Sequence, residues 1–218
     1  MALSREQIAQ RVAQELQDGY YVNLGIGIPT LVANYVPDNM EVMLQSENGL
    51  LGMGQFPTEE EIDADLINAG KQTVTMAKGA SIFDSAESFA MIRGGHVDLT
   101  VLGAFEVDVN GNIASYMIPG KLIKGMGGAM DLVAGADNII VTMTHASKHG
   151  VSKLLTNCSL PLTGKACIKK VLTDLALIEI KEGKFHLLER APGVSVEEII
   201  KLTEGELVVA GDIPEMTF

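Results

Sequence analysis

The sequence predicts one α/β domain over residues 1–218, a single domain with a mixed, mostly parallel sheet flanked by helices. Segments of strand character alternate with segments of helical periodicity along the whole chain. Two hairpin patterns require that part of the sheet is antiparallel. No linker rich in Pro, Gly or Ser divides the chain, and it lacks a repeat with a period of roughly 20–50 residues.

The N-terminal segment is typical of an amphipathic helix. Ser4 and Gln7 form a helix-start signature, and we expect the helix to end at Gly19. Its apolar stripe consists of Ile8, Val12 and Leu16. The segment lacks the apolar region of a secretory signal.

A strand, a glycine turn and a helix are expected next. Residues 21–24 have strand character, residues 25–27 form the turn, and a helix is expected over 29–36 because Pro is favoured at the first helical position. Further strands are expected over 41–46 and near 73–76.

The middle of the chain combines a capped helix, an apolar strand and a hairpin. Asp84 is a typical N-cap, and Gly94-Gly95 ends the helix that it starts. Residues 97–103 form a strongly apolar strand, and residues 105–116 alternate about Asn110-Gly111 like a hairpin.

The C-terminal part is expected to alternate in the same way. Its expected elements are a glycine-rich turn with a short helix (120–133), a strand (138–143), a helix (164–175), a hairpin (176–189), a helix capped by Ser195 and a strand (206–211).

The chain is acidic, with 16 basic and 28 acidic residues and a net charge of −12. This balance argues against a nucleic-acid backbone or an anionic membrane as the partner. The charge is uneven, because residues 1–120 hold 5 basic and 16 acidic residues whereas residues 121–170 hold 7 basic and 2 acidic ones. We therefore expect an anionic ligand to bind near segment 121–170.

The cysteines show no metal-binding or disulfide spacing. Cys158 and Cys167 are expected to be packing residues in a reducing compartment, which favours a cytoplasmic protein. No stretch of about 18 apolar residues, as a membrane-spanning helix needs, occurs in the sequence.

The histidines also give no metal site. His145 and His149 are four residues apart but lack the glutamate of a zinc-binding HExxH helix, so we expect both in a solvated loop. His96 and His186 lie next to strand residues and are expected to be structural histidines with satisfied hydrogen bonds.

Two glycine turns match nucleotide-binding motifs only in part. The turn at 25–27 has Thr30, and the turn at 125–127 has Met130, where a dinucleotide fingerprint needs its third glycine. Such turns after strands expose backbone N–H groups that can bind anions or oxyanions, or they serve only as tight turns.

Glu47 stands at the carboxyl end of the expected strand 41–46, where α/β sheets place their ligands. Gly49, Gly52 and Gly54 let the chain turn sharply and leave room for a substrate. A catalytic carboxylate and an ordinary Asn-Gly turn with a solvated glutamate both fit these residues.

Segment 44–52, with the sequence LQSENGLLG, resembles the active-site signature of the B (β) subunit of family I coenzyme A transferases. This group contains the succinyl-CoA:3-oxoacid and the acetate/butyrate:acetoacetate CoA-transferases. Further segments that resemble the family, in the same order, are 22–29, 93–98, 119–121, 125–133 and 161–163. The resemblance spans most of the chain and is specific because these motifs occur together.

The resemblance implies an α/β fold shared with some sugar-phosphate isomerases, and it implies that Glu47 is a nucleophile. The carboxylate would attack a thioester carbonyl to give an acyl-glutamyl anhydride, and the released CoA thiolate would then form a glutamyl-CoA thioester. No cofactor is expected to be permanently bound, since coenzyme A is a substrate, and no metal is expected.

The resemblance also implies roles for other residues. Gly128, with Asn23 and Ala129, would stabilise the oxyanion formed at each acyl step. Lys71 matches a CoA-contacting lysine of the succinyl-CoA:3-oxoacid enzymes, although an exposed structural lysine is the alternative. The expected CoA-binding residues are Lys71, Gly25, Gly27 and Gly127.

By this resemblance the chain is the catalytic (β) half of a 3-oxoacid CoA-transferase that acts between a short acyl-CoA, with succinyl-CoA favoured, and acetoacetate. It matches only the B half of the family enzymes, so the A (α) half is expected as a partner, in an assembly such as α2β2. The alternatives are an acetate/butyrate:acetoacetate CoA-transferase and an acyl-CoA hydrolase. A sugar-phosphate-sensing regulatory domain would not need Glu47.

Overall fold

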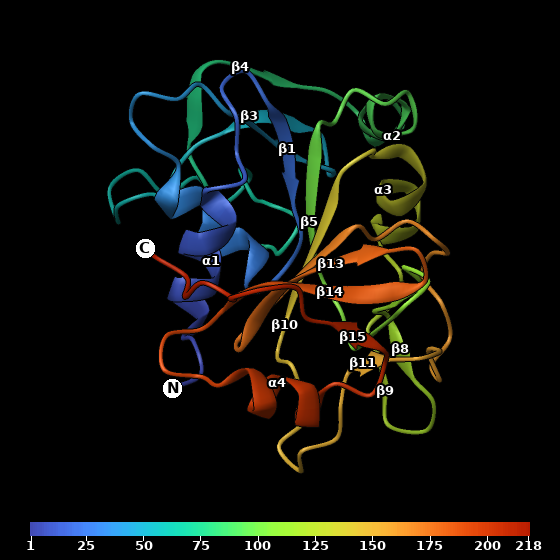
Figure 1. The fold of residues 1–218 in the computed structure, drawn as a ribbon. Coiled ribbons are helices and arrows are strands. Elements are labelled where there is room, and N and C mark those ends of the chain that lie inside the picture. The colour runs from blue at the N-terminus through green and yellow to red at the C-terminus, as the bar shows by residue number, and fades with distance from the viewer.

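A ten-stranded mixed sheet forms the centre of the molecule in the computed structural model, which describes residues 1–218 (Figure 1). The strand order is β15-β14-β13-β12-β10-β5-β1-β2-β3-β4. The strands are β1 (Tyr21–Leu24), β2 (Met43–Ser46), β3 (Leu50–Met53), β4 (Met76–Ile82), β5 (Leu99–Gly103), β10 (Ile139–Met143), β12 (Lys170–Thr173), β13 (Ala176–Lys181), β14 (Lys184–Arg190) and β15 (Leu207–Val208).

The five central strands β2, β1, β5, β10 and β12 run parallel to one another. Strands β3 and β4 at one side, and β13 and β14 at the other, join by antiparallel pairing. The prediction of a mixed sheet with a parallel centre is therefore confirmed. The carboxyl ends of these five parallel strands therefore all lie at the same edge of the sheet.

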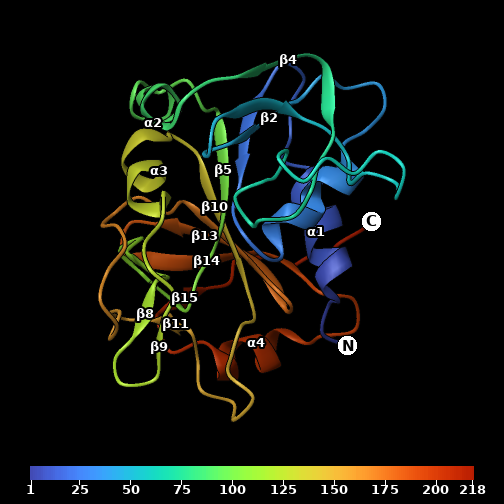
Figure 2. The ribbon, with the colours of Figure 1, turned by 180° about the vertical axis from the view of Figure 1, so that it is seen from behind.

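Helices cover both faces of this sheet. The helix α1 (Arg5–Ala13) packs with η1 (Pro29–Tyr35) on one face, and α2 (Ser85–Arg93) packs with α3 (Ala129–Gly135) on the other (Figures 1 and 2). The helix α4 (Val196–Leu202) lies at the opposite end of the molecule from α2 (Figure 1). One contiguous cluster of 42 buried apolar residues fills the space between sheet and helices.

The predicted helix starts are confirmed. Ser4, Asp84 and Ser195 are the N-caps of α1, α2 and α4, and each side chain accepts a hydrogen bond from a backbone N–H three residues later. The first helix ends at Ala13 and not at Gly19, because the backbone tightens to i→i−3 hydrogen bonds at Gln14. Segment 29–35 is likewise a 3₁₀ helix and not an α-helix.

The helix expected over 164–175 is wrong, since Lys170–Thr173 is strand β12. Val171, Leu172 and Thr173 are all buried between β10 and β13. A strand that is buried on both faces is apolar without alternation, so its pattern is easily mistaken for that of a buried helix. The glycine-rich segment after Glu47 also forms strand β3, which the sequence did not predict.

Short strands complete the fold. The predicted hairpin over 105–116 is confirmed by the antiparallel pair β6 (Glu106–Asp108) and β7 (Ile113–Ala114), and β11 (Leu154–Leu155) joins β6. A second small hairpin, β8 (Met117–Ile118) with β9 (Leu122–Ile123), projects from the domain beside β11 (Figure 1).

A nearly buried ion cluster ties the first helix to the sheet. The Arg11 guanidinium donates to both carboxylate oxygens of Glu189 at 2.8 and 2.6 Å and to Glu15 at 3.0 Å. Lys170 also donates to Glu15 at 2.6 Å. Burial by itself raises the pKa of Glu15, but its ion pairs with Lys170 and Arg11 outweigh burial and hold the pKa below its usual value.

Candidate active site

A cavity of about 430 Å³ opens at the carboxyl ends of the central parallel strands. It is lined by the segments that follow β1, β2, β5 and β10, and by the turn that leads into α3. This is the edge at which α/β sheets place their ligands. Of the predicted site residues, the cavity brings together Asn23, Gly25, Gly27, Glu47, Gly127, Gly128 and Ala129.

Glu47 is the first residue after β2 and is half-buried in the cavity wall. The turn behind it requires glycine at position 49, because φ is +120° there and a Cβ would lie 2.1 Å from the carbonyl oxygen of Phe83. The Phe83 N–H in turn donates to the Gly49 carbonyl. The turn is therefore packed directly against the start of α2, which directs the Glu47 side chain into the cavity.

The residues on either side of Glu47 are bonded to one loop. The Ser46 hydroxyl accepts from the Ala69 N–H at 2.9 Å, and the Asn48 amide donates to the Ile67 carbonyl at 2.7 Å. Lys71 lies in the exposed turn that continues this loop, with a left-handed φ of 62°, and it does not line the cavity. Lys71 is thus near the Glu47 segment in the fold but apart from the cavity wall.

Burial raises the pKa of the Glu47 carboxyl, and a hydrogen bond from its own backbone N–H opposes this only in part. None of the ion pairs in the chain includes Glu47. The carboxylate is therefore poorly solvated and unpaired, as a carboxylate nucleophile needs to be.

Gly128 packs against Glu47. A Cβ at position 128 would lie 3.2 Å from Glu47 Cγ and 2.9 Å from Phe89 Cε1. The N–H groups of Gly127 and Gly128 donate to no backbone carbonyl, whereas the Ala129 N–H donates to the Met126 carbonyl at 3.0 Å. Gly127 and Gly128 are therefore the backbone donors of this turn that an oxyanion beside Glu47 could use.

Asn23 is fully buried on β1, beside Gln45 on β2. Its Nδ2 donates to Gln45 Oε1 at 2.8 Å and to the Gln45 carbonyl at 3.3 Å, while its Oδ1 has no partner. In this arrangement Asn23 directs an acceptor, not a donor, away from Gln45.

Two lysines of the cavity were not singled out from the sequence. Lys124 and Lys153 both line it, and both belong to the basic segment 121–170 that was expected to attract an anionic ligand. Lys124 Nζ lies 5.7 Å from the centre of the Phe105 ring. Burial lowers the pKa of Lys153, and the charge of Asp174 opposes this shift.

Two of the histidine predictions are wrong. His145 is not in a solvated loop but fully buried, with Nδ1 and Nε2 each 2.9 Å from the hydroxyls of Thr173 and Thr203. Burial lowers its pKa to about 4. His149 is exposed, as expected, and His186 has a buried Nε2 without a partner instead of the satisfied bonds expected of it.

The surroundings of the two cysteines favour packing roles over a nucleophilic one. Both are unpaired and partly buried, and burial raises the pKa of Cys158 to about 12 and that of Cys167 to about 11. No group of three or more His, Cys, Asp or Glu side chains is placed to hold a metal ion. None of the helices has the length and apolar character to span a membrane.

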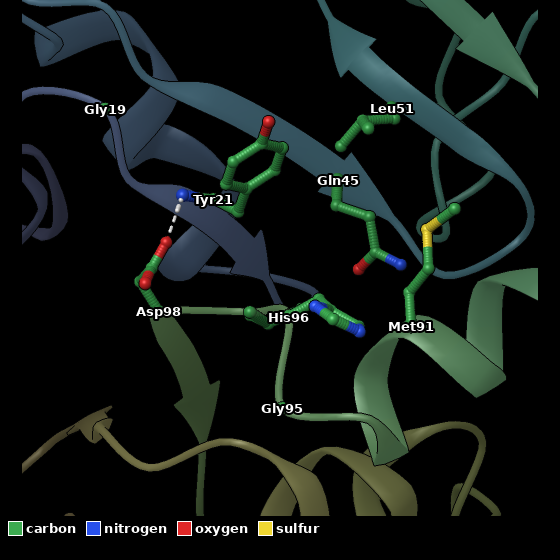
Figure 3. Close-up of a pocket in the computed structure, with 9 residues that line it drawn as sticks. Gly19, Tyr21, Gln45, Leu51, Met91, Gly95, His96 and Asp98 are labelled. Carbon is green, nitrogen blue, oxygen red and sulfur yellow. Dashed lines mark hydrogen bonds between the residues drawn. The ribbon is translucent and has the colours of Figure 1, made fainter.

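A second cavity, of about 560 Å³, lies at the edge where β1 and β5 begin (Figure 3). Tyr21, Gln45, Met91, His96 and Asp98 are among its lining residues. The Asp98 carboxylate accepts from the Tyr21 N–H at 2.8 Å (Figure 3). None of the predicted site residues lines this cavity, so the cavity that holds Glu47 is the candidate active site.

The fold and the cavity define an α/β enzyme domain with an unpaired carboxylate, glycine N–H donors and two lysines at the carboxyl ends of its parallel strands. A family model described as coenzyme A transferase matches residues 5–202. The chain therefore belongs to the coenzyme A transferase family and is a CoA-transferase.

Individual relatives agree. The chain is 55% identical to the B subunit of the probable succinyl-CoA:3-ketoacid coenzyme A transferase of Bacillus subtilis, over 98% of this chain and 99% of that protein. It is 52% identical to the β subunit of the acetate CoA-transferase of Haemophilus influenzae, over 98% and 95% of the two chains. The acyl-CoA transferase structure of Escherichia coli O157:H7 shares the fold, with a TM-score of 0.78 and 22% identity over all of this chain and 45% of that one.

Proposed function

We propose that the chain is the catalytic (β) half of a 3-oxoacid CoA-transferase that moves CoA between succinyl-CoA and acetoacetate through a covalent thioester on Glu47. The observation that carries this proposal is the position of Glu47: half-buried, unpaired, and in contact with the backbone of Gly128. The Bacillus subtilis relative is named for the same donor and acceptor class.

The proposed transfer of CoA to Glu47 consists of two acyl substitutions, the first at the thioester carbonyl and the second at the glutamyl carbonyl. The Glu47 carboxylate adds to the thioester carbonyl, and loss of CoA thiolate leaves an acyl-glutamyl anhydride. The thiolate then adds to the glutamyl carbonyl, and the donor's carboxylate leaves, so that Glu47 carries CoA as a thioester. The acceptor carboxylate runs the same two steps in reverse.

The residues around Glu47 support each step of this scheme. Poor solvation makes the carboxylate a better nucleophile, and the N–H groups of Gly127 and Gly128 can stabilise the oxyanions. Lys124 and Lys153 offset the negative charge of substrate carboxylate and CoA phosphates. Lys71 remains the proposed contact for a more distant part of CoA.

Acetate, in place of succinate, is the second candidate for the carboxylate that exchanges CoA with acetoacetate. It is favoured by the 52% identity to the acetate CoA-transferase relative, which is nearly as high as that to the succinyl-CoA relative. The acyl-CoA hydrolase alternative would require water in place of the acceptor carboxylate.

We also propose that a separate α subunit covers the mouth of the cavity, in an assembly such as α2β2. The names of both relatives compared above specify one subunit of an enzyme, the B or β one. Ile26 and Met126 line the cavity yet are 67% and 48% exposed, and Ile123 on the β8–β9 hairpin is 75% exposed. Apolar side chains grouped at a site mouth favour coverage by a partner, across an interface of at least about 1,000 Å².

Co-expression with the gene for the α subunit, sought next to the gene for this chain, tests the proposal. The complex is incubated with succinyl-CoA without acceptor, and a CoA thioester on Glu47 should be detected by intact mass and removed by borohydride. Glu47→Gln should abolish both the adduct and transfer to acetoacetate, whereas Glu41→Gln, at an exposed acid ahead of the same strand, should change neither.

Three outcomes would contradict parts of the proposal. Turnover that does not depend on acetoacetate would identify a hydrolase. Loss of only about tenfold in kcat for Glu47→Gln, a barrier change of about 1.4 kcal/mol, would remove Glu47 as the nucleophile. Full transfer by this chain alone, free of any partner by mass, would remove the role of the α subunit.

A further inference from the structure

Three buried polar side chains form a hydrogen-bonded chain from α2 to the wall of the active-site cavity. Ser88, Gln45 and Asn23 lie on α2, β2 and β1, and they are 0%, 2% and 0% exposed. Asn23 Nδ2 donates to Gln45 Oε1 at 2.8 Å, and Gln45 Nε2 donates to Ser88 Oγ at 3.0 Å. Figure 3 shows the Gln45 side chain reaching from β2 toward the helix that carries Met91, which is α2.

One end of this chain, which we call the Ser88–Gln45–Asn23 relay, borders the reacting groups. Asn23 lines the cavity that holds Glu47, and Glu47 follows Gln45 by two residues, immediately after β2 ends. The Oδ1 of Asn23 is buried and has no partner. A buried acceptor without a partner is costly, so it marks a place where a ligand or a second arrangement completes the hydrogen bonds.

The relay has two possible hydrogen-bond directions. An amide group has a donor end and an acceptor end, and a serine hydroxyl can donate or accept. In the second direction the Ser88 hydroxyl donates to Gln45 Oε1, Gln45 Nε2 donates to Asn23 Oδ1, and Asn23 Nδ2 is left free to donate into the cavity. The 3.3 Å bond from Asn23 Nδ2 to the Gln45 carbonyl is lost in this direction, and Asn23 Oδ1 then lies beside that carbonyl oxygen, a cost that negative charge on a bound acyl group must offset.

We propose that Gln45 and Ser88 are positioning residues that set which end of the Asn23 amide faces the acyl group. The inference rests on the proposed acyl transfer at Glu47. In the observed direction Asn23 presents its acceptor oxygen, Oδ1, and we assign this direction to the resting site, before an oxyanion forms. Negative charge that develops on the acyl oxygen draws the donor end of Asn23 toward it, and the relay reverses with it.

This arrangement explains why three polar side chains are buried together beside an apolar core. A lone asparagine at position 23 would lose a bond whenever its amide turned. With Gln45 and Ser88 behind it, every buried atom between Ser88 and Asn23 has a partner in either direction, and the atom left over always belongs to Asn23. The relay thus supplies a donor during the reaction without leaving an unpartnered atom on the side chains of Gln45 or Ser88.

A double-mutant cycle on the complex with the α subunit tests the relay. Asn23→Ala should lower kcat about 100-fold, as for one oxyanion donor, and Ser88→Ala about tenfold, with KM for succinyl-CoA within about twofold of wild type. Because both act through the same amide, the double variant should be no slower than Asn23→Ala alone. Melting temperatures of all variants report whether they fold.

Gln45→Glu provides a second variant if Ser88→Ala is poorly folded. Its carboxylate only accepts, so it holds Asn23 in the observed direction, and kcat should fall to the level of Asn23→Ala. Losses that multiply in the cycle, or an unchanged kcat in Ser88→Ala and Gln45→Glu, would overturn the relay while wild-type transfer still supports the proposed function. Absence of transfer and of the Glu47 adduct in the wild-type complex would instead overturn the proposed function, and the relay with it.

Discussion

The backbone of Gly128 lies against the side chain of Glu47, so that a Cβ at position 128 would come within 3.2 Å of Glu47 Cγ. Position 128 has an ordinary φ of −81°, which any residue can adopt. The glycine is therefore required by the space that Glu47 and Phe89 occupy and not by backbone conformation. A substitution at position 128 should therefore affect catalysis more than folding.

We expect Gly128→Ala to lower kcat about 100-fold with little change in melting temperature, because the new methyl group displaces the Glu47 carboxylate from its attack position. Gly128→Val should be at least as slow. Gly127→Ala is the matched control: position 127 has a φ of +48° and open space around its Cβ, so it should lose stability and keep more activity per folded molecule. Steady-state kinetics and thermal melts of both variants test this prediction. Equal kinetics for the two alanine variants would contradict the role assigned to Gly128.

We expect Glu47→Gln to stabilise the fold at neutral pH. Burial raises the folded-state pKa of Glu47 above its ordinary value of 4.5, so wild-type stability is unaffected below 4.5 and is lost as pH rises through the folded pKa. Glutamine carries no charge and escapes this loss. Urea unfolding should show a more stable variant at pH 8 and no difference at pH 4, and a variant that is less stable at pH 8 would refute the burial argument.

We expect Lys124→Ala to raise KM for succinyl-CoA about fivefold at low salt, the equivalent of about 1 kcal/mol, because its charge lies at the cavity. Lys71→Ala should also raise KM, with an effect that salt removes. Lys201→Ala, on the exposed side of distant α4, should leave KM unchanged. An unchanged KM for Lys71→Ala at low salt would place Lys71 outside the CoA site.

We expect a pH-dependent loss of stability from His145. Its pKa falls from 6.5 in the unfolded chain to about 4 in the fold, so its full contribution is present above 6.5 and is lost as pH falls toward 4, by about 3 kcal/mol. The His145→Gln variant should be less stable at pH 7, and its free energy of unfolding should change less between pH 6.5 and pH 4. Parallel pH profiles for the two proteins in urea unfolding would show that His145 does not titrate in this way.

The position of Glu47 could be predicted from the sequence because its signals are local. An apolar strand followed by a charged residue and closely spaced glycines is typical of a side chain presented at a sheet edge, and segment 44–52 carries all of them. The helix caps were predicted for the same reason. Each depends on residues three apart in the chain.

The features that the sequence did not predict depend on distant contacts. His145 is buried because Thr173 and Thr203, 28 and 58 residues away, bond its two ring nitrogens. The pattern of residues 164–175 predicts a helix because only the neighbours β10 and β13 make β12 a central strand. Lys124 reaches the cavity because of the path of the β8–β9 hairpin that precedes it, and this hairpin carries no strong sequence pattern of its own.

The two bonds from Ser46 and Asn48 to the 67–69 loop have a consequence for the speed of the first step. They fix the chain immediately before and after Glu47, so the backbone beneath the carboxylate has few conformations to lose when a substrate arrives. The conformational entropy of the nucleophile is lost when the chain folds and not each time a substrate binds. A thioester that enters the cavity therefore meets a carboxylate already held at high effective concentration.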